Sequence, residues 1–174
     1  TVFMSDTTVN ERPSSEELAY IAEQTAQVAR RMGHTPRVAF LSYSTFGNPA
    51  GNWLGNIREA VAILDSRKVA FEYEGEMAPD VALNPALMAN YPFCRLSGPA
   101  NVLVMPAAHS ASISTKMLQQ LGGVTVVGPL LTGLDKPVQP LGVWYSGIYA
   151  QDEWQASSRF KLTYGLRLDL PIFD

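Results

Sequence analysis

Four polar side chains between a predicted strand and a predicted helix are the first candidates for chemistry. They are Ser42, Ser44, Thr45 and Asn48, in a glycine-containing loop that runs from 42 to 52. Small hydroxyl groups and free backbone amides suit phosphate oxygens, and ligands of open α/β sheets bind beyond the carboxyl ends of the strands. An ordinary loop between a strand and a helix explains the same composition, because the segment is neither a Walker loop nor a G-x-G-x-x-G motif.

Two further segments follow predicted strands. In the segment 106–112, His109, Ser110 and Ser112 precede a predicted helix. His109 could bond an acyl or phosphate oxygen, cap that helix or stay on the surface. In the segment 128–138, Lys136 offers a cation for an anionic ligand, and a solvated surface lysine is the alternative.

Other reactive residue types form no recognisable motif. The chain has no Ser/His/Asp pattern, no metal-spaced cluster and no paired catalytic carboxylates. The acidic run Glu72, Glu74 and Glu76 favours a solvated strand end over a metal site. Cys94 is expected to pack in the core, because the sequence places no base beside it.

Composition narrows the class of protein. The 174 residues suffice for one domain with a core, and a net charge of -3 leaves no basic surplus for nucleic acid. A single cysteine suits a reducing compartment. No apolar run approaches the roughly 18 residues of a membrane helix. The N-terminal segment has no charged region followed by an apolar one, so no signal peptide is visible. We therefore expect a cytoplasmic protein without a membrane or nucleic-acid partner.

Hydrophobic periodicity predicts strands that alternate with helices. Ser14 and Glu17 have capping-box spacing before a helix that ends near Gly33. A helix over 112–121 is expected to turn Ile113, Met117 and Leu118 inward. Strands separated by helical segments indicate an α/β fold, a mostly parallel sheet with flanking helices on both faces. The strands are expected at 38–42, 69–73, 101–106 and 124–128, and further helical segments after 53 and over 79–88.

The hydrophobic period changes after Gln139. Apolar residues alternate with polar ones over 160–169, and 143–152 is a similar aromatic-rich strand with no helix between them. This pattern predicts a C-terminal antiparallel β-hairpin. The expected domains are therefore an incomplete α/β domain over 1–139 and a foreign or divergent hairpin tail over 140–174.

Several long segments together resemble the phosphotransacetylase family. The resemblance covers about 1–139 and is closest to the phosphotransacetylase-like C-terminal domain of bacterial NADP-dependent malic enzymes. The segments that carry it are Met4-Ser5-Asp6-Thr7-Thr8-Val9-Asn10, Ser42 to Pro49, Phe71 to Pro85, Tyr91 to Leu103 and Gly133 to Gln139.

This resemblance implies a function and partners. It implies a fragment of a regulatory domain that senses acetyl-CoA and helps to form an oligomer, with acetyl-CoA or CoA bound by the candidate residues above. NADP and a divalent metal would belong to the malic and NADP-binding domains of the parent enzyme, which this sequence lacks. The enzyme alternative is a phosphate acetyltransferase, which moves an acyl group between phosphate and CoA.

One departure from the family bears on that choice. Transferases of the family carry a Ser-Arg pair shortly after the Lys-Pro motif, whereas Pro140-Leu141-Gly142 follows Gln139 here. The expectation is therefore that this chain alone is inactive. The tail, in contrast, resembles strands of TonB-dependent outer-membrane receptors, so a receptor fragment is a second alternative. A divergent tail that pairs with the α/β sheet would explain the alternation equally.

Overall fold

The computed structural model describes residues 1–133, 143–157 and 160–173. It divides into two compact units, Thr1–Gly133 and Leu134–Asp174, each of which is described by itself. The predicted domain boundary at Gln139 lies outside the described residues. Within the described part, no helix is long and apolar enough to cross a membrane.

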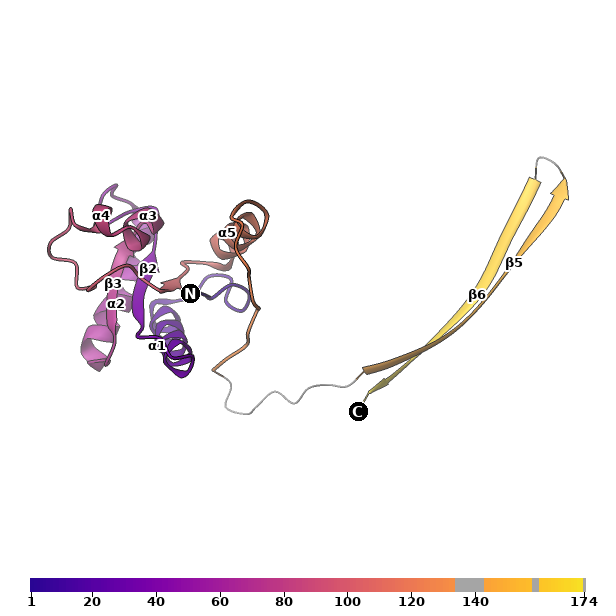
Figure 1. Ribbon diagram of the computed structural model, residues 1–174, viewed down its shortest axis with the longest axis horizontal. Helices are drawn as coiled ribbons and strands as arrows, with labels where there is room; N and C mark the ends of the chain where they lie inside the picture. The colour runs from indigo at the N-terminus through magenta and orange to yellow at the C-terminus, as the bar shows by residue number, and fades with distance from the viewer. Residues whose placement is uncertain (134–142, 158–159, 174) are drawn as a thin grey trace. The chain divides into compact units, whose positions relative to one another are not determined.

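The first unit is built on a four-stranded parallel sheet (Figure 1). The strand order is β1 (Phe3–Ser5), β4 (Val102–Val104), β2 (Arg37–Leu41) and β3 (Glu72–Met77). All neighbouring strands are parallel, with Phe3 opposite Val102 and β4 between β1 and β2. The predicted α/β class with a mostly parallel sheet is confirmed.

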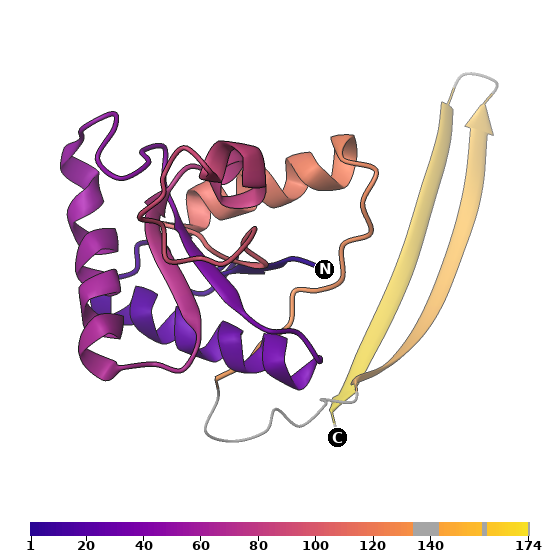
Figure 2. The same cartoon turned by 60° about the vertical axis from the view of Figure 1, so that its left-hand side comes forward.

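Helices cover both faces of this sheet (Figure 2). On one face, α1 and α2 pack on a core cluster that includes Val38, Phe40 and Val102. The alternate residues of β2 and β4, among them Ala39 and Leu103, face the opposite way toward α3, α4 and the start of α5. The helices are α1 (Ser15–Arg31), α2 (Gly55–Arg67) after the short 3-10 helix η1 (Asn52–Leu54), α3 (Pro79–Leu83), α4 (Pro85–Met88) and α5 (Ala108–Leu121).

The predicted limits of α1 are confirmed. The Ser14 hydroxyl accepts a hydrogen bond from the backbone N–H of Glu17, and the Glu17 carboxylate accepts one from the Ser14 backbone N–H. This reciprocal pair satisfies two donors that a helix start would otherwise leave free. Gly33 ends the helix with a φ of +83°, a left-handed conformation that glycine adopts without steric cost.

One strand begins later than its hydrophobic run predicts. The strand expected at 69–73 runs instead from Glu72 to Met77. Because α2 continues to Arg67 and Lys68 adopts left-handed backbone with φ +51°, the chain is still turning over 69–71. Val69 and Phe71 pack on the core from this turn.

Helix α5 and residues 124–128 also depart from the prediction. No strand forms over 124–128; Val124, Val126 and Val127 are exposed. The side chains of Ile113, Met117 and Leu118, which were predicted to face inward, are exposed on α5. Both predictions came from apolar spacing alone, which does not show whether another element covers an apolar face. Within residues 1–133 only Ala111 of α5 is buried.

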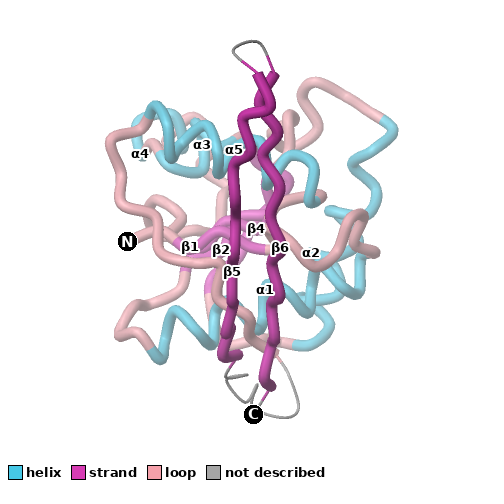
Figure 3. The backbone as a smooth tube through the Cα atoms, turned by 90° about the vertical axis from the view of Figure 1, so that its right-hand side faces the viewer, coloured by secondary structure: helices cyan, strands magenta, loops and turns pink. Residues whose placement is uncertain are grey.

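The second unit contains two long strands, β5 (Val143–Ser157) and β6 (Phe160–Phe173) (Figure 3). They pair antiparallel, from Val143 opposite Phe173 at one end to Ser157 opposite Phe160 at the other.

Candidate functional site

The carboxyl edge of the parallel sheet brings two of the predicted segments together. β2 and β4 are hydrogen-bonded neighbours, with Phe40 opposite Val104, so the chain segments that leave them emerge side by side. These segments carry Ser42–Asn48 and His109–Ser112. Crevices at the carboxyl ends of parallel strands are the usual place for ligands in such sheets. We therefore treat this edge as the candidate site.

The serine and threonine side chains at positions 42, 44 and 45 face inward rather than toward solvent. Ser44 and Thr45 are buried. The Ser44 hydroxyl donates to Oε1 of Glu76 at 3.2 Å, and Thr45 Oγ1 accepts the N–H of Ala78 at 2.9 Å. Ser42 Oγ accepts the N–H of Ser44 at 3.2 Å. These three predicted ligand residues therefore hold the loop in shape, which leaves its backbone and its exposed residues to meet a ligand.

Two positive backbone angles give this loop its sharp turn. Phe46 has φ +48° and Gly47 has φ +92°, both in the left-handed region. The turn is closed by reciprocal backbone hydrogen bonds between Thr45 and Asn48, at 2.9 and 3.1 Å. Asn48 is exposed at its tip. The ring of Phe46 lies 4.9 Å from that of Phe93, centroid to centroid, which ties the loop to the segment after α4.

Glu76 is the main anchor of the loop, and the sequence did not reveal it. Its side chain is only 1% exposed. Oε1 accepts the N–H of Gly47 at 2.7 Å and Nη2 of Arg58 at 2.8 Å, and Oε2 accepts Nε of Arg58 at 2.7 Å. Burial alone would raise the pKa of Glu76, but the hydrogen bonds from Arg58 and Gly47 outweigh it and hold the pKa below its usual value.

The predicted solvated strand end at Glu72, Glu74 and Glu76 is therefore wrong for two of its three members. Glu74 is also buried. Because β3 runs on to Met77, these glutamates lie inside the strand rather than at its end. A charge inside a sheet needs a partner, and both partners, Arg58 and Arg95, come from other segments of the chain.

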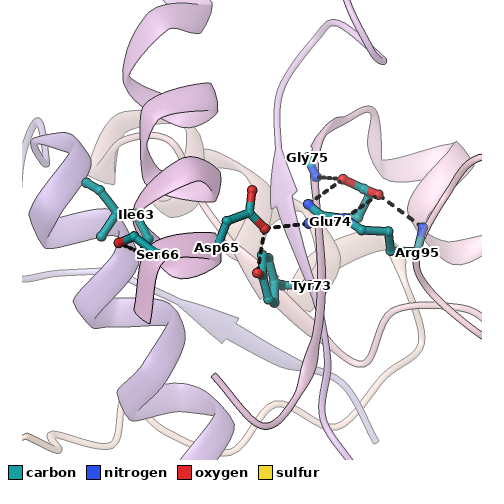
Figure 4. A network of polar contacts seen from close by, with 7 residues as sticks. All are labelled: Ile63, Asp65, Ser66, Tyr73, Glu74, Gly75 and Arg95. Atoms are coloured by element: carbon teal, nitrogen blue, oxygen red, sulfur yellow. Dashed lines mark hydrogen bonds and ion pairs between the residues drawn. The ribbon is translucent and has the colours of Figure 1, made fainter. Parts of the chain in front are cut away.

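Arg95 holds Glu74 in a second network (Figure 4). Its Nε and Nη2 donate to the two oxygens of Glu74 at 3.0 Å each, and Nη1 donates to Asp65 of α2 at 2.6 Å. The guanidinium also lies 4.7 Å from the ring centre of Tyr73, whose hydroxyl donates to Asp65. Burial, with help from Asp65, raises the pKa of Tyr73 to about 12. This network fastens the segment after α4 to β3 and α2.

The loop after β1 borders the site on the far side of β4, and sequence reasoning did not single it out as a candidate. The carboxylate of Asp6 accepts the backbone N–H groups of Thr8, Val9 and Asn10, at 2.7 to 2.9 Å. Burial would raise the pKa of Asp6, but these hydrogen bonds keep it below its usual value. The signal that could have revealed this loop is an aspartate followed by several residues whose amides it can accept, the pattern of an Asx turn.

The start of α5 lies beside this loop without a side-chain cap. The N-cap residue is Ala107, so the predicted alternative of His109 as the cap is wrong. The Ala108 N–H donates to the Glu11 carbonyl, and the Ser110 hydroxyl turns back to the Ala107 carbonyl. Within residues 1–133 the backbone N–H groups of His109 and Ser110 have no acceptor, and the first turn has no acidic residue.

The remaining candidates contribute little to this edge. The His109 side chain is exposed and that of Ser112 is half-buried. Lys136 lies outside the described residues. Cys94 packs, as expected, against the core cluster that contains Ala39 and Leu103, and burial raises the pKa of its thiol. The described residues contain no group of three His, Cys, Asp or Glu side chains that could hold a metal ion.

Two shallow grooves occur elsewhere on the first unit. One lies at the opposite edge of the sheet, between Arg30, His34 and Glu72. The other lies beside Cys94 and is lined by Met88 and Tyr91. Neither contains a predicted site residue. Neither groove therefore belongs to the candidate site at the carboxyl edge.

Known proteins resemble the first four fifths of the chain. A NADP-dependent malic enzyme of Rhizobium meliloti is 68% identical over 139 residues, which cover 80% of this chain and 18% of that protein. A phosphate acetyltransferase of Paracoccus denitrificans is 41% identical over 75% of this chain and 42% of its own length. The EutD phosphotransacetylase structure from Staphylococcus aureus superposes with a TM-score of 0.71 at 34% identity, over 77% of this chain and 42% of that one.

The chain thus spans less than half of each of these relatives. None of the three is a receptor, so the receptor-like reading of the tail has no support. The family model for phosphate acetyl/butaryl transferases matches residues 1–143, the part that contains the parallel sheet, the loop after β2 and the start of α5. The chain belongs to the phosphate acetyl/butaryl transferase family.

Proposed function

We propose that the first unit binds acetyl-CoA or CoA as the regulatory domain of a NADP-dependent malic enzyme in the cytoplasm. The identity of 68% to a malic enzyme supports this choice over a free-standing transferase. In this proposal, the malic and NADP-binding domains of a longer protein hold the NADP and the divalent metal. This chain contributes the acyl-CoA sensor and part of a homo-oligomer.

The start of α5 carries the proposal on the structural side. A helix start presents free N–H groups and the positive end of the helix dipole, which favour an anion such as the phosphate of CoA. The free amides of His109 and Ser110, together with the exposed His109 ring, give α5 this character. Asn48 is the exposed member of the predicted set on the neighbouring loop. We retain Ser42, Ser44 and Thr45 as residues that hold that loop, with Lys136 and Ser112 as further proposed contacts.

Calorimetric titration of the whole chain with acetyl-CoA and with CoA tests this function. We expect saturable binding that weakens when Ser110 is replaced by proline, since proline has no N–H to offer at this helix start. Ser114→Ala, in the interior of the same helix, is the matched control. Absence of any heat signal with either ligand, in a chain that circular dichroism shows to be folded, would remove the proposal.

A phosphate acetyltransferase activity is the second candidate, because a relative of that name is 41% identical. The absence of the family's Ser-Arg pair after Gln139 counts against it. Formation of acetyl-CoA from acetyl phosphate and CoA is a direct assay. We expect no turnover above the rate without protein, and measurable turnover would favour this candidate instead.

A further inference from the structure

Arg58 occupies an unusual place at the candidate edge. It lies in the first turn of α2, which follows the loop after β2 and the short helix η1. A cation at a helix start faces the positive end of the helix dipole and is disfavoured there. Glu76 compensates for this placement, since its buried carboxylate accepts hydrogen bonds from two of the guanidinium nitrogens. The arginine is thus held where a positive charge would not otherwise be favoured.

The ion pair is strongly asymmetric in its exposure. The Glu76 side chain is 1% exposed, whereas that of Arg58 is 53% exposed. Nε and Nη2 are fixed by the carboxylate, and Nη1 has no hydrogen bond within residues 1–133. The buried acid therefore fixes the plane of the guanidinium from inside while its outer edge stays available to solvent.

The glycine turn lies directly beside the guanidinium. A Cβ atom at Gly47 would lie 3.6 Å from Nη2 of Arg58, and glycine has none. Gly47 is also fixed by Glu76, through its N–H. The same carboxylate therefore places both the arginine and the glycine turn, and position 47 adds no side chain beside Nη2.

We propose that Arg58 is an anion-binding residue that contacts a phosphate group of the ligand, and that Glu76 is its positioning residue. A planar guanidinium forms paired, charge-assisted hydrogen bonds with phosphate oxygens. The inference rests on the proposed function, to which it adds a phosphate contact on the α2 side of the edge. The competing explanation is a purely structural ion pair, in which Arg58 only neutralises Glu76.

Affinity measurements on the whole chain separate the two explanations. We expect Arg58→Gln to weaken CoA binding by about tenfold or more, the loss that one charge-assisted hydrogen bond implies. Binding of pantetheine, which has no phosphate, should not change. The control is Arg67→Gln, at the other end of α2. Arg67, like Arg58, forms ion pairs with glutamate, in its case with two of them. Glu76→Gln should weaken CoA binding in the same direction, since it frees the guanidinium from its fixed plane.

A second measurement keeps the test valid if a variant unfolds or CoA does not bind. The Nε–H signal of Arg58 in the nitrogen-15 NMR spectrum of the unmutated chain is followed during titration with pyrophosphate. A saturable shift that the Arg67 signal does not share supports the inference, and no shift overturns it. If CoA binds equally well to wild type and Arg58→Gln, the inference fails while the proposed function stands. If wild type binds no CoA, the proposed function fails and the pyrophosphate titration alone decides on Arg58.

Discussion

Replacing Arg95 by methionine should destabilise the first unit by about 3 kcal/mol. The change leaves Glu74, whose side chain is 7% exposed, with two backbone N–H donors and no countercharge. Charge-assisted hydrogen bonds contribute about 1.5–3 kcal/mol each. Since the Arg95 side chain is 42% exposed, we take about 2 kcal/mol for the pair on Glu74. The contact with Tyr73 adds about 0.5–1 kcal/mol, and the half-exposed Asp65 adds little.

Arg67→Met is the matched control for this prediction. Arg67 also pairs with two acids, but one of them, Glu16, is 69% exposed and the pair is open to solvent. Its loss should cost less than about 1 kcal/mol. Urea unfolding followed by circular dichroism measures both variants. Equal losses for the two would refute the reasoning, because burial of the acid would then not decide the cost. Adding Glu74→Gln to Arg95→Met should recover part of the loss, since no buried charge remains unpaired.

Three further predictions concern stability and titration. Ser14→Ala should lower the free energy of unfolding by about 1 kcal/mol, because α1 loses its N-cap, and an unchanged urea midpoint would contradict this. The pKa of Glu76 is lower in the folded chain than in the unfolded one. Its contribution to the free energy of unfolding is therefore fully present above the unfolded pKa of 4.5 and is lost as pH falls through the folded pKa. The free energy of unfolding of Glu76→Gln should depend less on pH in this range. Tyr73, with a pKa of about 12, should ionise later than an ordinary tyrosine in an absorbance titration, and Asp65→Asn should bring its ionisation to lower pH.

Local sequence signals predicted the parts of the fold that local chemistry decides. The capping box at Ser14 and the glycine at 33 set the limits of α1, and both are confirmed. Apolar runs located β2 and β4, so the two segments that follow them were correctly placed after strands. Their proximity is a property of the sheet order, which brings β4 next to β2.

Long-range pairing decided what the sequence did not show. Nothing near Glu74 or Glu76 indicates that each has an arginine partner, because Arg95 lies after α4 and Arg58 lies in α2. Without those partners a run of alternating glutamates is most simply explained by solvent. The same limit applies to the hydroxyls of Ser44 and Thr45, whose inward direction depends on β3.

The prediction of which α5 side chains are buried was wrong for a related reason. The apolar residues of α5 were assigned to the inside from their helical spacing alone. The periodicity of a helix shows which residues share a face, but not whether another element covers that face. In residues 1–133 the face that contains Ile113 and Met117 is exposed.

The position of β4 between β1 and β2 has a consequence for synthesis on the ribosome. Within residues 1–133, β1 pairs with β4 alone, and its partner for Phe3 is Val102. When β1, α1 and β2 have emerged, the two strands have no hydrogen bonds to share, and the space between them stays open until β4 has been translated. β1 and β4 are far apart in the sequence, and closing the loop between them costs entropy before their hydrogen bonds can form. We therefore expect the sheet to fold late and slowly. Until then, the nascent chain exposes the edges of β1 and β2, and this interval is when it would be most prone to aggregate.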